Sequence, residues 1–189
     1  MSFTTPNLMR LDLQESLKNS TIELRDLSPF QRVLLTTDGM VTEILEAYTW
    51  ERVTVSKLLQ DQVAADEPIT ELDLEPGETL LRRTILLHGT KSQRNHIYAH
   101  SLLCVDRLDD KIRDGLLNSA KPIGLLIQEN QLETFREVLV CEKHAASELA
   151  THFDVGPESS LISRTYRVFA YGLPIMLITE KFPEGSFRT

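Results

Sequence analysis

Two long strand-like runs joined by a tight turn occupy the end of the sequence and limit the folds that the chain can adopt. SLISRTYRVFAYG (160–172) leads directly into LPIMLITEKF (173–182). Runs rich in β-branched and aromatic residues that flank a short turn form antiparallel hairpins. A second pair of this kind is TLLRRTILLHG (79–89) and NHIYAHSLLCVDRL (95–108), across the loop GTKSQR. We therefore predict one antiparallel sheet built from hairpins.

Helical patterns occur before and between the strand patterns. SPFQRVLLTT (28–37) has the signals of a helix start, with Ser28 as the cap, Pro29 at the first turn and Gln31 closing a capping box. DGMVTEILEAYT (38–49) predicts a second helix with Asp38 as its cap. The remaining elements are predicted as strands at 51–58 and 133–143 and as short helices at 109–120, 121–130 and 145–156.

This order of elements predicts an α+β domain with one antiparallel sheet that helices cover on one side. The 189 residues favour one domain, which we place at 28–189, preceded by an N-terminal arm at 1–27.

Composition limits the classes of partner. The formal net charge of −8 argues against binding to nucleic acid or to anionic membranes, because both need a basic face. A small anionic ligand remains compatible with this charge, since a few local arginines reverse the sign inside a cleft.

The sequence shows no secretory signal and no apolar run near the ~20 residues of a membrane-spanning helix, so we expect a cytoplasmic protein with no membrane insertion. Cys104 and Cys141 are expected to be reduced core thiols. The histidines lack metal-ligand spacing, and we find no P-loop, dinucleotide-binding glycine motif or Ser/His/Asp set.

Arg82 and Arg83 are neighbours within one predicted strand. Because consecutive strand residues point to opposite faces, one of the two must point inward. A buried arginine needs an anionic partner, and a carboxylate held by two parallel hydrogen bonds suits it best. That carboxylate belongs either to a ligand or to a structural Asp or Glu on the next strand.

Two helix starts could supply further anion contacts. In KPIGLL, Pro122 leaves the amides of Ile123 and Gly124 without partners inside the helix, and Gly124 permits close approach to the backbone. Met40 has a similar place in TTDGMVT. The alternative for both is an ordinary helix start with solvated amides.

Glu180 follows the apolar run of the last predicted strand. It is either an exposed acid at the end of the strand or a carboxylate at the edge of a cleft. In the cleft it can pass a proton or bind a hydroxyl group.

Taken in order, several segments resemble the chorismate pyruvate-lyase (4-hydroxybenzoate synthase) family, and most closely its cyanobacterial, plastid and archaeal branch. The resemblance covers roughly residues 28–185. The matching segments are RVLLTTDGMVTEILE, LLRRTILL, YAHSLL, KPIGLLI and SRTYRVFAYGLPIMLITEKFPEG.

The resemblance implies a single six-stranded antiparallel sheet with helices packed on one side over an internal ligand cavity. It implies elimination of pyruvate from chorismate to give 4-hydroxybenzoate, a product used in quinone biosynthesis such as that of plastoquinone, without a metal or redox cofactor. Chorismate and the hydroxybenzoate product are then the partners.

For the site, the resemblance implies that Arg82 binds the ring carboxylate, with backbone contacts at Met40, Ile123 and Gly124, and that Glu180 is the catalytic acid. His100 stands where proteobacterial members have an arginine. Arg136 or Arg164 is then a candidate partner for the second carboxylate of the substrate.

Two alternatives to this activity remain. One is a non-catalytic aromatic-acid sensor, since the same fold serves as the ligand-sensing domain of bacterial repressors. We expect this alternative to be weaker, because about 27 residues are too few for a winged-helix domain ahead of the sensor. The other is a related elimination that gives 3-hydroxybenzoate.

Overall fold

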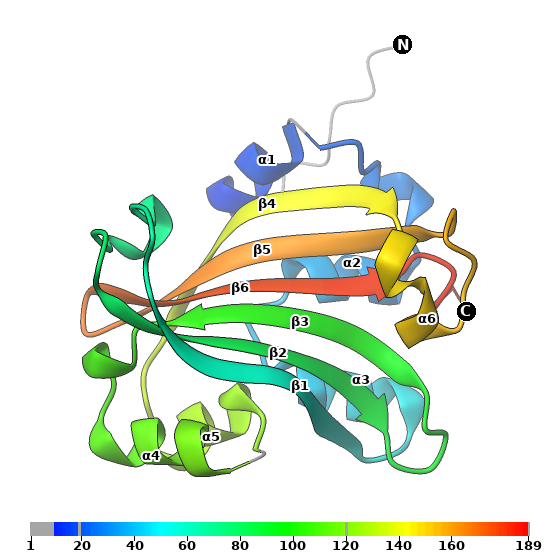
Figure 1. Ribbon diagram of the computed structural model, residues 1–189. Helices are drawn as coiled ribbons and strands as arrows, with labels where there is room; N and C mark the ends of the chain where they lie inside the picture. The colour runs from blue at the N-terminus through cyan, green and yellow to red at the C-terminus, as the bar shows by residue number, and fades with distance from the viewer. Residues whose placement is uncertain (1–9, 19, 120, 189) are drawn as a thin grey trace.

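A computed structural model describes residues 10–18, 20–119 and 121–188 of the chain, and its centre is one twisted antiparallel sheet (Figure 1). The spatial order of the strands is β1-β2-β3-β6-β5-β4. The strands are β1 (Val53–Ala64), β2 (Thr79–Gly89), β3 (Asn95–Leu103), β4 (Phe135–Ala145), β5 (Ser160–Ala170) and β6 (Leu173–Pro183).

The sheet consists of two groups of three consecutive antiparallel strands, β1–β2–β3 and β4–β5–β6, and the last turn lies at Tyr171 and Gly172. Both turn residues have positive φ, 54° and 75°. A two-residue turn with this conformation matches the twist of the flanking strands, which explains why a glycine stands at its second position. The hairpin places β6 at the centre of the sheet, between β5 and β3.

The helices divide between the two faces of the sheet. We call inner the face that carries Leu87 of β2, Ala99 of β3 and Ile178 of β6. In Figure 1, α2 and α3 lie behind the sheet on this face, and α4 and α5 follow beside β1, whereas α6 lies in front. The helices are α1 (Leu11–Lys18), α2 (Pro29–Thr36), α3 (Val41–Thr49), α4 (Asp110–Asn118), α5 (Ile123–Glu129) and α6 (Ala150–Phe153).

The capping box predicted at the start of α2 is confirmed. The Ser28 side chain accepts a hydrogen bond from the Gln31 amide, and the Gln31 side chain accepts one from the Ser28 amide. Gln31 Nε2 also donates to the carbonyl oxygens of Glu184 and Ser186. One buried amide side chain therefore starts the helix and ties it to the C-terminal segment.

The second predicted cap is wrong. Met40, not Asp38, stands at the N-cap position of α3, and no side chain caps this helix. The Asp38 carboxylate instead lies 3.5 Å from Nη1 of Arg136.

The main hydrophobic core lies between the inner face and the helices, and Leu13 and Leu17 of α1 belong to it. The described part of the predicted N-terminal arm is therefore packed against the sheet, while the boundary at residue 28 stays a prediction. Cys104 and Cys141 are free, buried thiols, as predicted. Within the described ranges, no helix has the length and apolar character needed to cross a bilayer.

The predicted fold class is confirmed, with one addition on the outer face. There the segment with the 3-10 helix Thr70–Leu72 covers one end of the sheet, and α6 covers the other. The middle of the outer face is polar.

The β2–β3 loop offers a test of pH dependence. The surface carboxylate of Glu51 accepts hydrogen bonds from the Ser92 hydroxyl and from the amides of Ser92 and Lys91. These bonds lower the pKa of Glu51 from 4.5 to about 2. Because the folded-state pKa of Glu51 is depressed, the stabilisation is present above pH 4.5 and is lost as the pH falls toward 2.

We expect Glu51→Gln to lower the melting temperature at pH 7, and we expect the difference from the wild type to disappear progressively as the pH falls below 4.5. Thermal unfolding of both proteins across this range would contradict us if the difference stayed constant.

Candidate functional site

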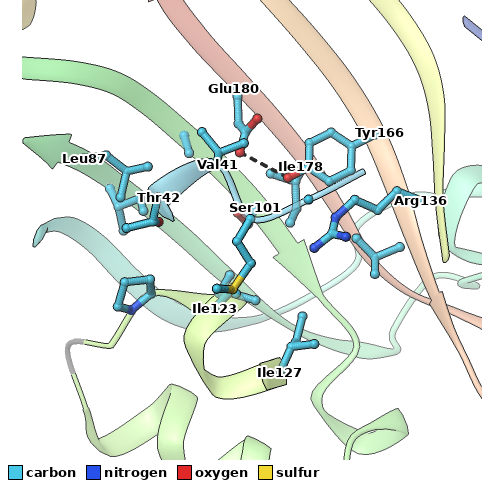
Figure 2. Close-up of a pocket in the computed structure, with 17 residues that line it drawn as sticks. Val41, Thr42, Leu87, Ser101, Ile123, Ile127, Arg136, Tyr166, Ile178 and Glu180 are labelled. Atoms are coloured by element: carbon cyan, nitrogen blue, oxygen red, sulfur yellow. Dashed lines mark hydrogen bonds between the residues drawn. The ribbon is translucent and has the colours of Figure 1, made fainter. Parts of the chain in front are cut away.

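A small cavity lies between the centre of the inner face and two helix starts. The sheet contributes residues of β2, β3, β5 and β6, and the helices contribute the first residues of α3 and α5 (Figure 2). Its sheet side includes Ile85, Leu87, Ala99, Ser101, Tyr166, Val168, Ile178 and Glu180. Its helix side includes Met40, Val41, Thr42, Pro122, Ile123, Gly124 and Ile127.

Small residues on β3 explain why the core leaves a space at this position. Ala99 and Ser101 occupy consecutive inner-face positions on β3, a central strand flanked by β2 and β6. Ala99 pairs directly with Glu180 of β6, and Ser101 pairs with Arg83 of β2. Larger side chains at these two positions would fill the space under the helices, whereas Ala99 and Ser101 leave it open. Each of the two has a charged residue as its neighbour on the adjacent strand.

Glu180 faces this cavity, and Arg164 is its ion-pair partner. The two residues are directly opposite each other on β6 and β5. Arg164 Nε donates to Glu180 Oε2 at 2.9 Å, and the two side chains are 1% and 10% exposed. Of the two readings of Glu180, the exposed strand end is therefore excluded.

A tyrosine completes this cluster. Tyr166 Oη donates to Glu180 Oε1 at 3.1 Å, drawn as the dashed line in Figure 2. The guanidinium of Arg164 lies 4.8 Å from the centre of the Tyr166 ring and also donates to the carbonyl oxygen of Thr37 at 2.9 Å. The cluster thus connects two sheet strands to the loop before α3.

The prediction that Arg82 turns inward is wrong. Arg82 lies on the outer face, with its side chain 42% exposed, and its Nε and Nη2 form a two-point pair with Asp61 of β1 at 3.1 and 2.7 Å. This is the structural carboxylate on the next strand that the sequence left open as an alternative. The two arginines have therefore exchanged the expected places.

Arg83 is the inward-facing residue. It is 1% exposed, and Nη2 donates to the Lys121 carbonyl oxygen at 3.0 Å. Its Nε and Nη1 are buried and have no hydrogen-bond partner within the described residues. Burial lowers the pKa of this guanidinium. A buried cation with two free donors, next to Ser101 of the cavity wall, is a site in need of an anion.

Arg136 of β4 also reaches the cavity. Its side chain is 14% exposed, and Nη1 donates to the Asp38 carbonyl oxygen. Figure 2 shows the guanidinium on the same side of the cavity as Tyr166. The sequence identified it only as one of two candidates for the second carboxylate.

The three backbone positions named from the sequence lie together at the cavity. Met40 precedes α3, and Ile123 and Gly124 are the first two residues of α5. A Cβ atom added at Gly124 would lie 2.9 Å from Met40 Sδ. Because Gly124 has no side chain, the Met40 side chain can pack between the two helix starts.

His100 does not face the cavity. It lies on the outer face, where its Nδ1 and the Thr84 hydroxyl are 3.0 Å apart. His100 is therefore not a cavity residue in this chain.

The free volume of the cavity is about 70 Å³, the space of two or three water molecules. A second, more open pocket of about 440 Å³ adjoins it and shares Met40, Thr42 and Pro122 with it. Those three side chains therefore lie between the small cavity and a larger groove. Among the described residues there is no group of three or more His, Cys, Asp or Glu side chains that could hold a metal ion.

Comparisons with known proteins place these observations in a family. The family model described as Chorismate pyruvate-lyase Rv2949c-like matches residues 35–188. A chorismate pyruvate-lyase of Mycobacterium tuberculosis is 29% identical over 171 residues, which are 88% of this chain and 85% of that protein. The enzyme of the same name from Mycobacterium leprae is 29% identical over 167 residues, 88% and 80% of the two chains.

Several solved structures of bacterial proteins have a fold similar to that of this chain. PhnF from Mycobacterium smegmatis superposes with a TM-score of 0.64 at 12% identity, over 82% of this chain and 67% of that one. The effector domain of the same protein superposes with a TM-score of 0.63 at 13% identity, over 80% of this chain and 91% of that one. A GntR-family transcriptional regulator from Bacillus cereus superposes with a TM-score of 0.56 at 15% identity, over 72% of this chain and 95% of that one. At these identities the likeness concerns the fold alone.

We predict that removing one partner of the buried ion pair strongly lowers the stability of the protein. We expect Arg164→Met to lower the free energy of unfolding by about 3–5 kcal/mol, because it leaves the Glu180 carboxylate buried without its cation. The double variant Arg164→Met/Glu180→Leu should recover most of this loss, since an apolar pair carries no desolvation cost. Urea unfolding at equilibrium measures both.

A partly exposed pair on the same strand serves as the control. Arg167 and Glu137 are 27% and 31% exposed. Arg167→Met should cost about 1 kcal/mol or less. Equal losses at residues 164 and 167 would show that burial of the Arg164–Glu180 pair does not govern its contribution.

Proposed function

Because the chain belongs to the Chorismate pyruvate-lyase Rv2949c-like family, we propose that it eliminates pyruvate from chorismate to give 4-hydroxybenzoate. The observation that carries the proposal is a cavity that is lined by the held carboxylate of Glu180 and lies next to Arg83, a buried guanidinium with two donors free within the described residues. The finer assignments, to the cyanobacterial, plastid and archaeal branch and to a quinone such as plastoquinone, rest only on the motif order and stay predictions.

The reaction defines what the cavity must do. Chorismate carries a ring carboxylate at C1, an enolpyruvyl ether at C3 and a hydroxyl at C4. Elimination breaks the C3–O and C4–H bonds, and the electrons of the C4–H bond form the last double bond of the aromatic ring. The hydrogen ends on the methylene carbon of the leaving enolpyruvate, which becomes pyruvate. No oxidant or reductant is consumed.

Arg83 binds the ring carboxylate in this proposal. Its Nε and Nη1 have no partner within the described residues, so they are donors that a carboxylate can accept. The role that the sequence gave to Arg82 passes to Arg83, because Arg82 is held by Asp61 on the other face. The amides at Ile123, Gly124 and Met40 contribute weaker contacts from the helix side.

The spacing of the sheet supports a substrate of this size. Arg83 lies on β2 and Glu180 on β6, two strand spacings apart, which is about 10 Å across the sheet. Their β3 neighbours, Ser101 and Ala99, are two residues apart, about 7 Å along the strand. Long side chains that converge from such positions span a six-membered ring with substituents at both ends.

Glu180 handles the proton. Its carboxylate lies in the cavity wall and is held there by the buried guanidinium of Arg164. We assign it the removal of the C4 hydrogen as a proton and the return of that proton to the enolpyruvate carbon. This differs from the sequence-based hypothesis of an acid at the ether oxygen, because the carboxylate accepts hydrogen bonds from both Arg164 and Tyr166 and is therefore placed as an acceptor.

Arg136 binds the carboxylate of the enolpyruvyl group. It stands on β4, on the side of Tyr166 and away from Arg83, so the two arginines separate the two carboxylates of the substrate. Its position at the loop of Asp38, where its side chain is partly exposed, also suits a group that must be released as pyruvate.

Substrate entry requires movement of the helix starts. A volume of about 70 Å³ is below the ~300 Å³ of the smallest ligand pockets. Displacement of the Met40 side chain would join the cavity to the adjoining groove of about 440 Å³. An unbranched thioether changes rotamer more easily than a branched or aromatic side chain would.

The assay that tests the proposal uses purified protein and chorismate. We expect pyruvate and 4-hydroxybenzoate in equal amounts, measured by a coupled pyruvate assay and by chromatography. Recovery of 3-hydroxybenzoate would move the activity to the related elimination. Tight binding of 4-hydroxybenzoate without turnover would support the sensor instead.

The neighbouring arginines supply a matched pair of variants. We expect Arg83→Met to lower kcat/KM about 10- to 100-fold, because charge-assisted hydrogen bonds contribute about 1.5–3 kcal/mol. Arg82→Met should leave kcat/KM close to the wild-type value. Steady-state kinetics on both decide between the two faces of β2, and a larger loss at residue 82 would reverse the assignment.

A further inference from the structure

The Tyr166 phenol lies in the cavity wall, and neither the sequence nor the proposed reaction has so far given it a task. The residue is 5% exposed and lines the cavity. Its hydroxyl donates to Glu180, and Figure 2 shows the ring beside Arg136. It is therefore a hydroxyl group between the proposed base and the proposed site of the enolpyruvyl carboxylate.

We propose that Tyr166 is a catalytic hydrogen-bond donor to the ether oxygen of chorismate, where it stabilises the negative charge that develops as the C3–O bond breaks. The inference rests on the proposed function and adds a residue to it. No proton is transferred in this role. The proton from C4 still passes through Glu180 to the methylene carbon, so the balance of the reaction is unchanged.

The leaving group creates the need for such a donor. As the C3–O bond breaks, its electron pair moves onto the oxygen of an enolate. The Glu180 carboxylate has no hydrogen to donate when it acts as the base, and its charge would oppose a second negative charge nearby. A neutral O–H group in a water-poor cavity meets the requirement, because such donors act most strongly where charge develops.

The position of Tyr166 on the sheet suits both partners. On β5, Tyr166 pairs with Ile178, whereas Arg164 pairs with Glu180. The phenol is therefore diagonal to Glu180, and Arg164 approaches the carboxylate directly. A hydroxyl hydrogen can rotate. Its rotation toward a ligand leaves Glu180 with its ion pair intact.

The surroundings keep the phenol protonated. Burial and the neighbouring Glu180 charge raise the pKa of Tyr166 well above its usual value, and Arg164 and Arg136 oppose this shift. The charged groups that face it thus come from β6, β5 and β4. The cavity residues of β3, α3 and α5 do not titrate. A phenol in this setting donates a hydrogen bond and does not act as a base.

The first test replaces only the hydroxyl group. We expect Tyr166→Phe to lower kcat about 100- to 1,000-fold, the usual effect of losing one donor to a developing oxyanion. The dissociation constant for 4-hydroxybenzoate, which lacks the ether, should change little. The control is Tyr171→Phe, because Tyr171 also donates to a carboxylate, Asp109, but on the exposed hairpin turn.

A second test separates direct donation from an action through Glu180. Fluorinated tyrosines of increasing acidity are incorporated at position 166, and kcat is measured at a pH where all of them remain protonated. A direct donor to the ether oxygen makes kcat rise with acidity. A donor that only positions Glu180 makes kcat fall, because a stronger hydrogen bond weakens the base. This series also applies if Tyr166→Phe does not fold.

The outcomes are distinct. If the wild-type protein releases no pyruvate, the proposed function fails before Tyr166 is tested. If the wild type is active and Tyr166→Phe retains its kcat, the inference about Tyr166 fails alone. A falling kcat across the fluorinated series overturns direct donation as well.

Discussion

The buried pair between Arg164 and Glu180 is the interaction on which the site depends. It joins two neighbouring strands at the centre of the inner face, and Arg164 also binds the carbonyl oxygen of Thr37 in the loop before α3. Such a pair contributes little to stability, because desolvation of two charges offsets most of their attraction. Its value here is positional. It fixes a carboxylate in an apolar cavity and sets the place of the helix start above it.

Much of the fold could be predicted because its signals are local. The hairpin at Tyr171 and Gly172 and the capping box of Ser28 and Gln31 both depend on residues a few positions apart. The inward orientation of Glu180 was left open by the residues alone. Its partner Arg164 is sixteen positions away, and only the pairing of β5 with β6 brings the two side chains together.

The exchange of Arg82 and Arg83 has a physical cause in the rest of β2. A half-covered strand alternates apolar and polar residues, and this alternation would show which arginine faces inward. In β2 it is missing, because Leu80 and Leu81 are both buried, as are Leu86 and Leu87.

The coverage of the outer face explains the missing alternation. The segment with the 3-10 helix Thr70–Leu72 covers the outer face at one end and α6 at the other, so apolar residues are needed on both sides of the strand there. Only the middle of the outer face is polar. The deciding partner of Arg82, Asp61, comes from β1, beyond the end predicted for that strand.

An aromatic-acid sensor and a lyase would make different demands on the far side of the cavity. A guanidinium such as Arg83 is enough to hold an aromatic acid, and a sensor needs nothing more than this and an apolar wall. Catalysis needs groups that act on the opposite edge of the ring, at C4 and at the ether oxygen.

In the proposed mechanism Glu180 and Tyr166 act at that edge, and Arg164 holds the carboxylate in place. A sensor would gain nothing from a buried ionised carboxylate beside an aromatic acid, because like charges repel and the cost of burial remains. A held carboxylate in the cavity wall, with a partly unsatisfied buried arginine next to the cavity, therefore favours an enzyme over a sensor. It also indicates which side of the substrate each group meets.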